Sequence, residues 1–321
     1  ATNQLIRLGM DPASGYDAKM INAGNIQNEG IEFMVTADII RSEGLKWNAQ
    51  LNLSHNENRI IKLYDGGGIE SPVTEYNLGT YDNLKILARE GGKYGEIWGS
   101  SYKRVEDKTS DLYGKIITDE NGLPIAGDEK KLGDQQPDLL AGLTNSFSFA
   151  GFDLSFLLDA RFGGKMFSGT NHALQAGGAA AATVVNGARD KFVVDGAVES
   201  EVAGKTVYTK NTVEVTPQDY WGAIVGRSGN LGINEANIYD ATSVRLRNIA
   251  LSYTLPKSLL KNTPITKAKL GISCNNVWMI KSYMNGIDPE SVFATGSNAT
   301  GYEFASSPTT RSFLFNITLG F

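Results

Sequence analysis

Apolar and polar side chains alternate with a period of two from Gly30 to Asn56, except at Ser42-Glu43-Gly44. Alternation of this kind places apolar groups on one face of a β-strand and polar groups on the other. The exception holds small and polar residues typical of a turn. The pattern therefore predicts two long antiparallel strands joined by a tight turn. The apolar positions are Ile31, Phe33, Val35, Ala37, Ile39, Trp47, Ala49, Leu51 and Leu53, and the polar ones include Glu32, Asp38, Lys46, Asn48, Gln50 and Asn52.

Three further segments show the same alternation and are predicted to be strands. They are a hairpin at residues 139–162 with its turn at Ala150-Gly151, a pair at 249–255 and 268–274 joined through residues 256–266, and a last strand at 313–321. In the 139–162 hairpin, Asp153, Asp159 and Arg161 occupy the polar face.

Four long stretches between these strands, at residues 60–83, 106–137, 163–242 and 280–308, show no regular alternation. Unstructured loops longer than about 12–15 residues are uncommon in compact soluble domains. Outer-membrane barrels, in contrast, alternate short periplasmic turns with long extracellular loops. We therefore interpret the chain as all-β, a portion of a large antiparallel transmembrane β-barrel with long extracellular loops.

The strand count follows from this orientation. If the short turns are periplasmic, the alternation of strand direction requires a further short hairpin near residues 84–105, turning at Gly91-Gly92. With this hairpin the chain has about ten barrel strands, and Phe321 ends in the periplasm. Large plugged transporter barrels have about 22 strands. Because lipid does not tolerate open sheet edges, we expect the other strands to come from sequence outside this chain. The N-terminal residues 1–8 run directly into strand-like sequence without a leader, which favours a start within a longer protein.

Composition narrows the function. The formal net charge of −5 leaves no basic surplus for phosphates, which argues against nucleic-acid binding. Cys274 is a single cysteine, and the two histidines, His55 and His172, are isolated, so neither a disulfide within the chain nor a zinc cluster is predicted. No run of about 20 apolar residues is present, which argues against a transmembrane helix.

The chain contains a series of short motifs, and their sequences and order resemble those of the SusC/RagA family of TonB-linked outer-membrane proteins. The resemblance covers essentially the whole chain. The motifs are residues 22–32 (NAGNIQNEGIE), 47–58 (WNAQLNLSHNEN), Glu96-Ile97-Trp98-Gly99 with Tyr102, 132–137 (LGDQQP), Tyr220-Trp221, 245–256 (RLRNIALSYTLP), 275–278 (NNVW), Asp288-Pro289-Glu290 and 311–321 (RSFLFNITLGF).

The resemblance implies that residues 1–321 form the C-terminal part of a TonB-dependent transporter barrel of about 22 strands. In this family the plug and the TonB box lie upstream, and a SusD-like surface lipoprotein covers the barrel as a lid. The implied function is active import of a glycan or peptide oligomer across the outer membrane of a Gram-negative, Bacteroidetes-like bacterium. The implied partners are TonB, the lid, the plug with the remaining barrel, and lipid.

Ligand contacts are expected in the loops. Aromatic rings beside amides suit sugars, because stacking buries C–H surface while hydroxyl groups take hydrogen bonds. The candidates are Trp98, Tyr102, Tyr220 and Trp221, whose alternative role is to order the loops. The loop aspartates match no EF-hand spacing, so they indicate solvated charge, and no metal or cofactor is predicted. They are Asp65, Asp107, Asp111, Asp119 and Asp128.

The sequence does not predict an enzyme, since it contains no GxSxG, HExxH or P-loop motif. Asp288-Pro289-Glu290 is interpreted as a loop motif of the family and not as an acid–base pair. The alternative function is a surface-displayed β-protein without transport, adhesive or structural. The apolar faces could likewise be the inside of a soluble sandwich. In the barrel interpretation, candidates for the aromatic girdles are Trp47, Phe152, Phe162, Tyr253 and Phe321.

Overall fold

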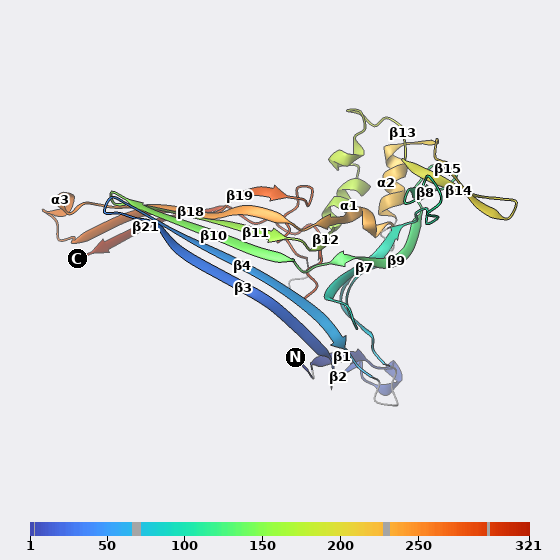
Figure 1. Cartoon of the computed structure of the whole chain (residues 1–321), viewed down its shortest axis with the longest axis horizontal. Coiled ribbons are helices and arrows are strands. Elements are labelled where there is room, and N and C mark those ends of the chain that lie inside the picture. Colours follow the sequence, from blue (N-terminus) through green and yellow to red (C-terminus); the bar gives the residue numbers. More distant parts are fainter. Residues whose placement is uncertain (3, 66–71, 227–231, 294–295) are drawn as a thin grey trace.

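The structure is a computed structural model that describes residues 1–2, 4–65, 72–226, 232–293 and 296–321. It consists of a long curved sheet, which we call the wall, and a lobe of shorter elements at one end (Figure 1). The lobe comprises the connections at residues 63–138, 163–242 and 283–311. The wall comprises β3 (Asn25–Arg41), β4 (Leu45–Lys62), β10 (Leu139–Phe149), β11 (Phe152–Phe162), β18 (Ser243–Thr254), β19 (Lys267–Ser282) and β21 (Ser312–Gly320).

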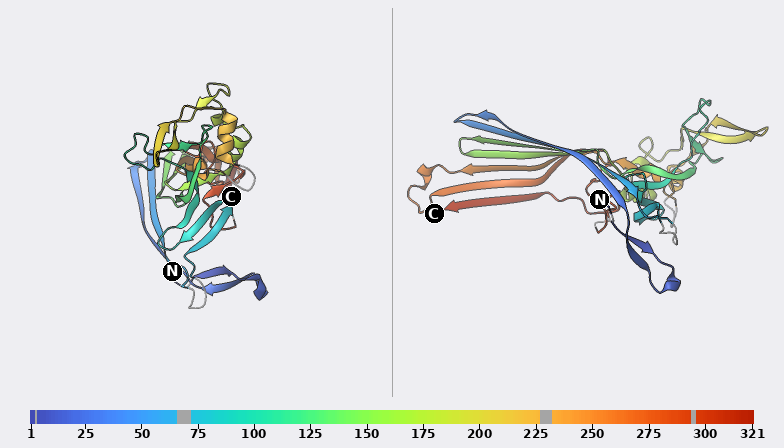
Figure 2. Two further views of the ribbon diagram at one scale, coloured as in Figure 1. Left: turned by 90° about the vertical axis from the view of Figure 1, so that its right-hand side faces the viewer. Right: turned by 60° about the horizontal axis from the view of Figure 1, so that its bottom comes forward.

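The wall strands lie in the order β21-β19-β18-β11-β10-β4-β3, and all neighbouring pairs are antiparallel. The three short connections lie at the end opposite the lobe, and the three long ones form the lobe (Figure 2). Ala150 and Gly151 have φ values of 49° and 87°, the two positive values that a type I′ hairpin turn requires. The three predicted hairpins and the last strand are confirmed.

One face of the wall carries five successive rows of mainly apolar side chains. Neighbouring rows are two residues apart, or about 6.7 Å along a strand, so five rows span about 27 Å along the strands. Many of these side chains are exposed, for example Phe315 at 77% and Ile317 at 70%. A continuous exposed apolar face of this height is typical of a barrel wall that contacts lipid. One row consists of Val35, Leu51, Leu143, Leu158, Leu246 and Trp278.

The opposite face of the wall is polar. Among its contacts, Lys269 Nζ lies 2.8 Å from Asp153 Oδ2, and Asn48 Nδ2 donates a hydrogen bond to Asp38 Oδ1 at 3.0 Å. The prediction of a shared polar face is confirmed by the strand register. Its predicted members are Glu32, Asp38, Lys46, Asn48, Gln50, Asn52, Asp153, Asp159 and Arg161.

Aromatic rings gather on the apolar face near the short turns. The rings of Phe152 and Tyr253 are 4.3 Å apart between centroids, and those of Trp47 and Phe147 are stacked at 5.4 Å. The indole N–H of Trp47 donates to Asn145 Oδ1 at 3.0 Å, which satisfies a polar group on the apolar face. Of the other predicted girdle residues, Phe162 ends β11 at the lobe end, and Phe321 follows β21 at the turn end.

The expected strand count needs correction, because the wall contains seven strands within the described residues and not about ten. The hairpin expected near residues 84–105 does form, as β6 (Leu84–Arg89) and β7 (Tyr94–Tyr102), but it belongs to a separate sheet of the lobe. The alternation of strand direction is kept without this hairpin, because β4 ends at the lobe and the next wall strand, β10, begins there. Strand β6 is only six residues long and is buried on both faces, unlike a lipid-facing strand.

The stretches expected to be irregular contain regular elements. No helix among the described residues has the length and apolar character needed to cross a membrane. The lobe strands are β5 (Glu75–Tyr81), β6, β7, β8 (Ile116–Thr118), β9 (Ala126–Asp134), β12 (Lys165–Ser168), β13 (Phe192–Val193), β14 (Gly196–Val202), β15 (Lys205–Lys210), β16 (Glu214–Val215), β17 (Ile238–Asp240) and β20 (Tyr302–Glu303). The remaining elements are α1 (Gly169–Ala176), α2 (Pro217–Val225) and the 3-10 helices Ala181–Thr183 and Asn234–Asn237 in the lobe, β1 (Leu5–Gly9), the 3-10 helix Pro12–Ser14 and β2 (Ala18–Asn22) near the N-terminus, and α3 (Lys257–Leu260).

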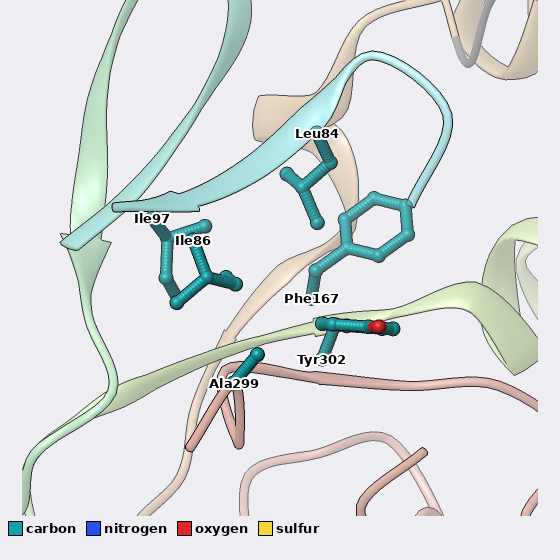
Figure 3. Close-up of a cluster of buried hydrophobic side chains, with 6 residues drawn as sticks. All are labelled: Leu84, Ile86, Ile97, Phe167, Ala299 and Tyr302. Atoms are coloured by element: carbon teal, nitrogen blue, oxygen red, sulfur yellow. The ribbon is translucent and has the colours of Figure 1, made fainter. Parts of the chain in front are cut away.

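A shared hydrophobic core joins the three connections of the lobe. The first connection contributes Leu84, Ile86 and Ile97, the second contributes Phe167, and the third contributes Ala299 and Tyr302 (Figure 3). All six side chains are at most 4% exposed. Because each connection buries its apolar groups against the other two, the long loops form one packed body.

Candidate functional site

Tyr102 and Tyr220, two of the predicted ligand-contact residues, meet inside the lobe. Their hydroxyl groups form a hydrogen bond with each other, and burial raises the pKa of both phenols above the usual value. The guanidinium group of Arg104 lies 5.4 Å from the centre of the Tyr102 ring. The backbone N–H of Tyr102 also donates to Glu235 Oε2 at 3.0 Å. These contacts connect the end of β7 to α2 and to the 3-10 helix that carries Glu235.

Glu235, in the second connection, binds two positively charged side chains of the first connection at this position. Its carboxylate accepts from Arg104 Nη2 at 2.7 Å and lies 3.6 Å from Lys130 Nζ. Burial acts to raise the pKa of Glu235, but the bonds from Arg104 and from the Tyr102 N–H outweigh burial and lower it. The carboxylate is therefore ionised at neutral pH and holds the two connections together.

Trp98 makes a different set of contacts on β7. Its indole N–H donates to Glu96 Oε2 at 3.0 Å, and the guanidinium group of Arg89 lies 4.1 Å from the ring centre. Glu96 is buried and also pairs with Lys131 at 2.7 Å. One face of the Trp98 ring is therefore covered by a cation of the same chain. This arrangement matches the alternative role of ordering the lobe.

Helix α2 positions Tyr220 and Trp221, and its start was not predicted. Thr216 caps the helix, because its Oγ1 accepts from the Asp219 N–H at 3.1 Å and donates to Asp219 Oδ2 at 2.6 Å. Pro217 occupies the first turn, where a missing N–H costs little. The sequence Thr-Pro-Gln-Asp at 216–219 is a recognisable helix-start signal that could have found this element.

Trp221 lines a cavity of about 800 Å³ along α2 and beside the end of α1. Its ring lies edge-on to Tyr220, with centroids 5.1 Å apart, and this contact fixes its direction. The cavity wall also includes the amide of Gln218, the guanidinium of Arg189 and the small residue Gly222. An aromatic ring, an amide and a guanidinium group around an open space fit a polar oligomer whose rings or C–H surfaces stack.

A second cavity of about 920 Å³ lies on the other side of the Tyr102 contacts. It is lined by Tyr102, Arg104, Lys108, Tyr113 and Tyr208, among others. Tyr113 is 54% exposed, so its ring is accessible from solvent. The structure therefore places Tyr102 and Trp221 at two separate cavities.

Two motifs that the sequence analysis left unconnected meet where the wall joins the lobe. Arg245 Nη1 donates to Asp288 Oδ2 at 3.0 Å, and the two side chains are only 6% and 9% exposed. Arg247 donates to Glu290 Oε2 at 2.8 Å and, through Nε, to Asp159 Oδ2 at 3.0 Å. We call these five residues the junction cluster.

Strand geometry explains why both arginines reach the cluster. The register of β18 against β11 shifts between Leu157 and Leu158, which leaves Arg247 as the extra residue of a β-bulge. The bond from Arg247 lowers the pKa of Glu290 despite partial burial. At Asp288, burial alone would raise the pKa, but Arg245, the Glu290 N–H and Thr309 outweigh it and lower it. Both carboxylates are therefore ionised at neutral pH.

Three of the five loop aspartates, Asp65, Asp107 and Asp119, make local contacts. Asp107 Oδ1 accepts from the Thr109 N–H at 2.8 Å, Asp119 Oδ1 accepts from the Asn121 N–H at 2.9 Å, and Asp65 pairs with Lys62 at 2.7 Å. In the part of the chain that the structure describes, no three His, Cys, Asp or Glu side chains gather as a metal site would require.

The sequence of the chain is similar to sequences of known proteins. No protein-family model matches the chain. It is 26% identical to TonB-dependent receptor P3 of Formosa agariphila, over 96% of this chain and 30% of that protein. It is 24% identical to TonB-dependent receptor SusC of Bacteroides thetaiotaomicron, over 96% of this chain and 28% of that protein.

A solved structure of the RagAB peptide importer in the "open-open" state shares the fold. The TM-score is 0.64 at 18% identity, covering all of this chain and 31% of that chain. The chain thus spans less than a third of the length of these proteins. The similarity confirms the predicted fold class, an all-β portion of a large antiparallel barrel.

Proposed function

Since this chain is related along almost its whole length to TonB-dependent receptors that include SusC, we propose that it forms the C-terminal part of an outer-membrane importer barrel. These relatives are outer-membrane receptors and transporters, not enzymes, in agreement with the predicted location and with the prediction that the chain is not an enzyme. The observation that carries the proposal is the wall, with its exposed apolar face, its short turns at one end and its packed long loops at the other.

In the proposed protein the short turns face the periplasm and the lobe faces the outside. The rest of the barrel joins the free edges β3 and β21, because unpaired backbone groups at these edges would find no partner in lipid. The driving force comes from TonB through a plug outside this chain. A SusD-like surface lipoprotein acts as a lid over the lobe.

The proposed cargo is a glycan or peptide oligomer, and Trp221 is its contact in this chain. Support comes from the cavity beside α2, which combines the Trp221 ring with the Gln218 amide and the Arg189 guanidinium. A cavity of about 800 Å³ lies within the usual range for ligand pockets. Tyr102, Tyr220 and Trp98 hold the lobe in shape around it.

Uptake by the whole receptor tests this function. Cells that carry the receptor are offered oligosaccharide and oligopeptide mixtures, and the molecules retained on the purified receptor are identified by mass spectrometry. We expect uptake to stop when TonB is deleted and a surface lipoprotein to co-purify. Uptake that continues without TonB, or surface display without any uptake, would favour the adhesive or structural alternative.

A matched pair of variants locates the ligand site. Trp221→Ala should weaken ligand binding about fivefold, since a stacked ring contributes on the order of 1 kcal/mol. Tyr113→Ala, which lies at the other cavity, should leave binding unchanged. Binding is measured by calorimetry on the whole receptor. Loss of binding in Tyr113→Ala but not in Trp221→Ala would move the site to the second cavity.

A further inference from the structure

The connection between β18 and β19 is longer than the two other turns at its end of the wall. Those turns contain three and two residues, whereas this one runs from Leu255 to Thr266 and contains α3. Hairpins usually need only about two to five residues to reverse direction. Figure 1 shows α3 at the end of the wall opposite the lobe, near the C-terminus. The additional residues therefore have a role other than closing the turn.

This connection carries unbalanced positive charge. The sequence contains no Asp or Glu between Asp240 and Asp288. Lys257 and Lys261 are exposed, and neither forms a salt bridge with a described residue. The neighbouring Lys269, in contrast, pairs with Asp153 at 2.8 Å. Two exposed ammonium groups thus lie four residues apart in a segment without Asp or Glu, in a chain whose net charge is −5.

An apolar group accompanies these charges. Leu259, in α3, is 67% exposed, although its neighbour Leu260 is partly buried. The strands on both sides lead directly into the lipid-facing rows of the wall, where Leu270 follows Lys267 by three residues and Tyr253 precedes Leu255 by two. The connection is therefore continuous with the apolar face at the edge of its band. Lysines beside an exposed leucine at this depth are typical of segments that bind the membrane interface.

We propose that the Leu255–Thr266 connection binds the phosphate headgroups of anionic phospholipids in the periplasmic leaflet. The ammonium groups of Lys257 and Lys261 attract the phosphate oxygens, and Leu259 enters the boundary between headgroups and acyl chains. Each lysine near an anionic surface strengthens binding about fivefold, which corresponds to about 1 kcal/mol, and high salt screens the effect. This inference rests on the proposed orientation, with the short turns in the periplasm.

The test uses the whole receptor in neutral detergent, titrated with phosphatidylglycerol and, as the neutral reference, with phosphatidylcholine. Native mass spectrometry counts the lipids that remain bound. The double variant Lys257→Gln, Lys261→Gln should weaken phosphatidylglycerol binding about 25-fold and leave phosphatidylcholine binding unchanged. Lys261→Gln alone should weaken it about fivefold, so the idea remains testable if the double variant folds poorly.

The control replaces two exposed lysines of the lobe, Lys205 and Lys210, with glutamine. It changes the net charge by the same amount and should keep phosphatidylglycerol binding. Unchanged binding in the first double variant, or equal losses in both, would overturn the proposal.

A separate experiment checks the orientation. Leu259→Cys should react with a membrane-impermeant maleimide only after the outer membrane is opened. The native Cys274 is 7% exposed and should add little background. Reaction on intact cells would refute the orientation, whereas a failed lipid titration would refute only the lipid site.

Discussion

The wall and the lobe use large apolar side chains in opposite ways. In the wall, Phe315 is 77% exposed on an apolar face that continues across all seven strands. In the lobe, Phe167 is fully buried in a core shared by three connections. The apolar face of the wall therefore needs lipid as its surroundings, whereas the lobe buries its apolar side chains against one another. The two regions thus place their apolar side chains in different surroundings within one chain. The junction cluster lies where they meet.

Removal of Arg245 should have the largest effect, because this residue connects the two regions. Arg245→Ala leaves the buried Asp288 carboxylate without its partner, and such a loss costs about 3–5 kcal/mol. The free energy of unfolding of the whole receptor, measured in denaturant, checks this value. Arg247→Ala removes a more exposed partner and should cost less, while Arg245→Ala combined with Asp288→Ala should recover part of the loss. A single variant as stable as the parent would mean that the cluster does not hold the regions together.

The wall is tested by placing one charge on either face. Ile249→Arg, in the central apolar row, should cost about 2–4 kcal/mol at the bilayer midplane. Ala250→Arg, its neighbour on the polar face, lies among Ser155 and Ser273 and should cost less than about 1 kcal/mol. The folded fraction in lipid vesicles, read from heat-modifiable migration, measures both. Equal effects at the two positions would mean that the apolar face does not contact lipid.

Lowering the pH should reduce the stability that the junction cluster provides. Because Arg247 lowers the pKa of Glu290, the stabilisation is present above the ordinary carboxyl pKa of 4.5 and is lost as the pH falls through the lowered value. Glu290→Gln removes the charge at every pH. The parent and the variant should therefore differ in melting temperature at neutral pH and converge at pH values well below 4.5. A constant difference across this range would show that Glu290 stabilises the junction by other means.

The sequence predicted the wall better than the lobe, for a physical reason. A strand with lipid on one side and a polar interior on the other must alternate, so residues 139–162 reveal both strands and their turn. A lobe strand such as β6 is buried on both faces and shows no alternation, and its hairpin was placed in the barrel. The junction cluster joins Arg245 to Asp288 across 43 residues, and no local pattern reveals such a contact. The family motif and the chemistry of aromatic rings point to Trp221, but its cavity depends on helix α2, whose capping signal lies before that motif.

The smallest effect is expected inside the lobe, at the hydrogen bond between Tyr102 and Tyr220. Tyr102→Phe removes one hydroxyl and leaves the other without its partner, which should cost about 0.5–1.5 kcal/mol. Because burial raises the pKa of Tyr102, the folded lobe keeps this phenol neutral, and its stability should fall as the pH rises past the ordinary tyrosine value of about 10. Tyr102→Phe should reduce that alkaline loss, whereas Tyr113→Phe, at an exposed ring, should not. If both variants lose stability equally at high pH, the alkaline sensitivity comes from elsewhere, and the lobe does not depend on this buried pair.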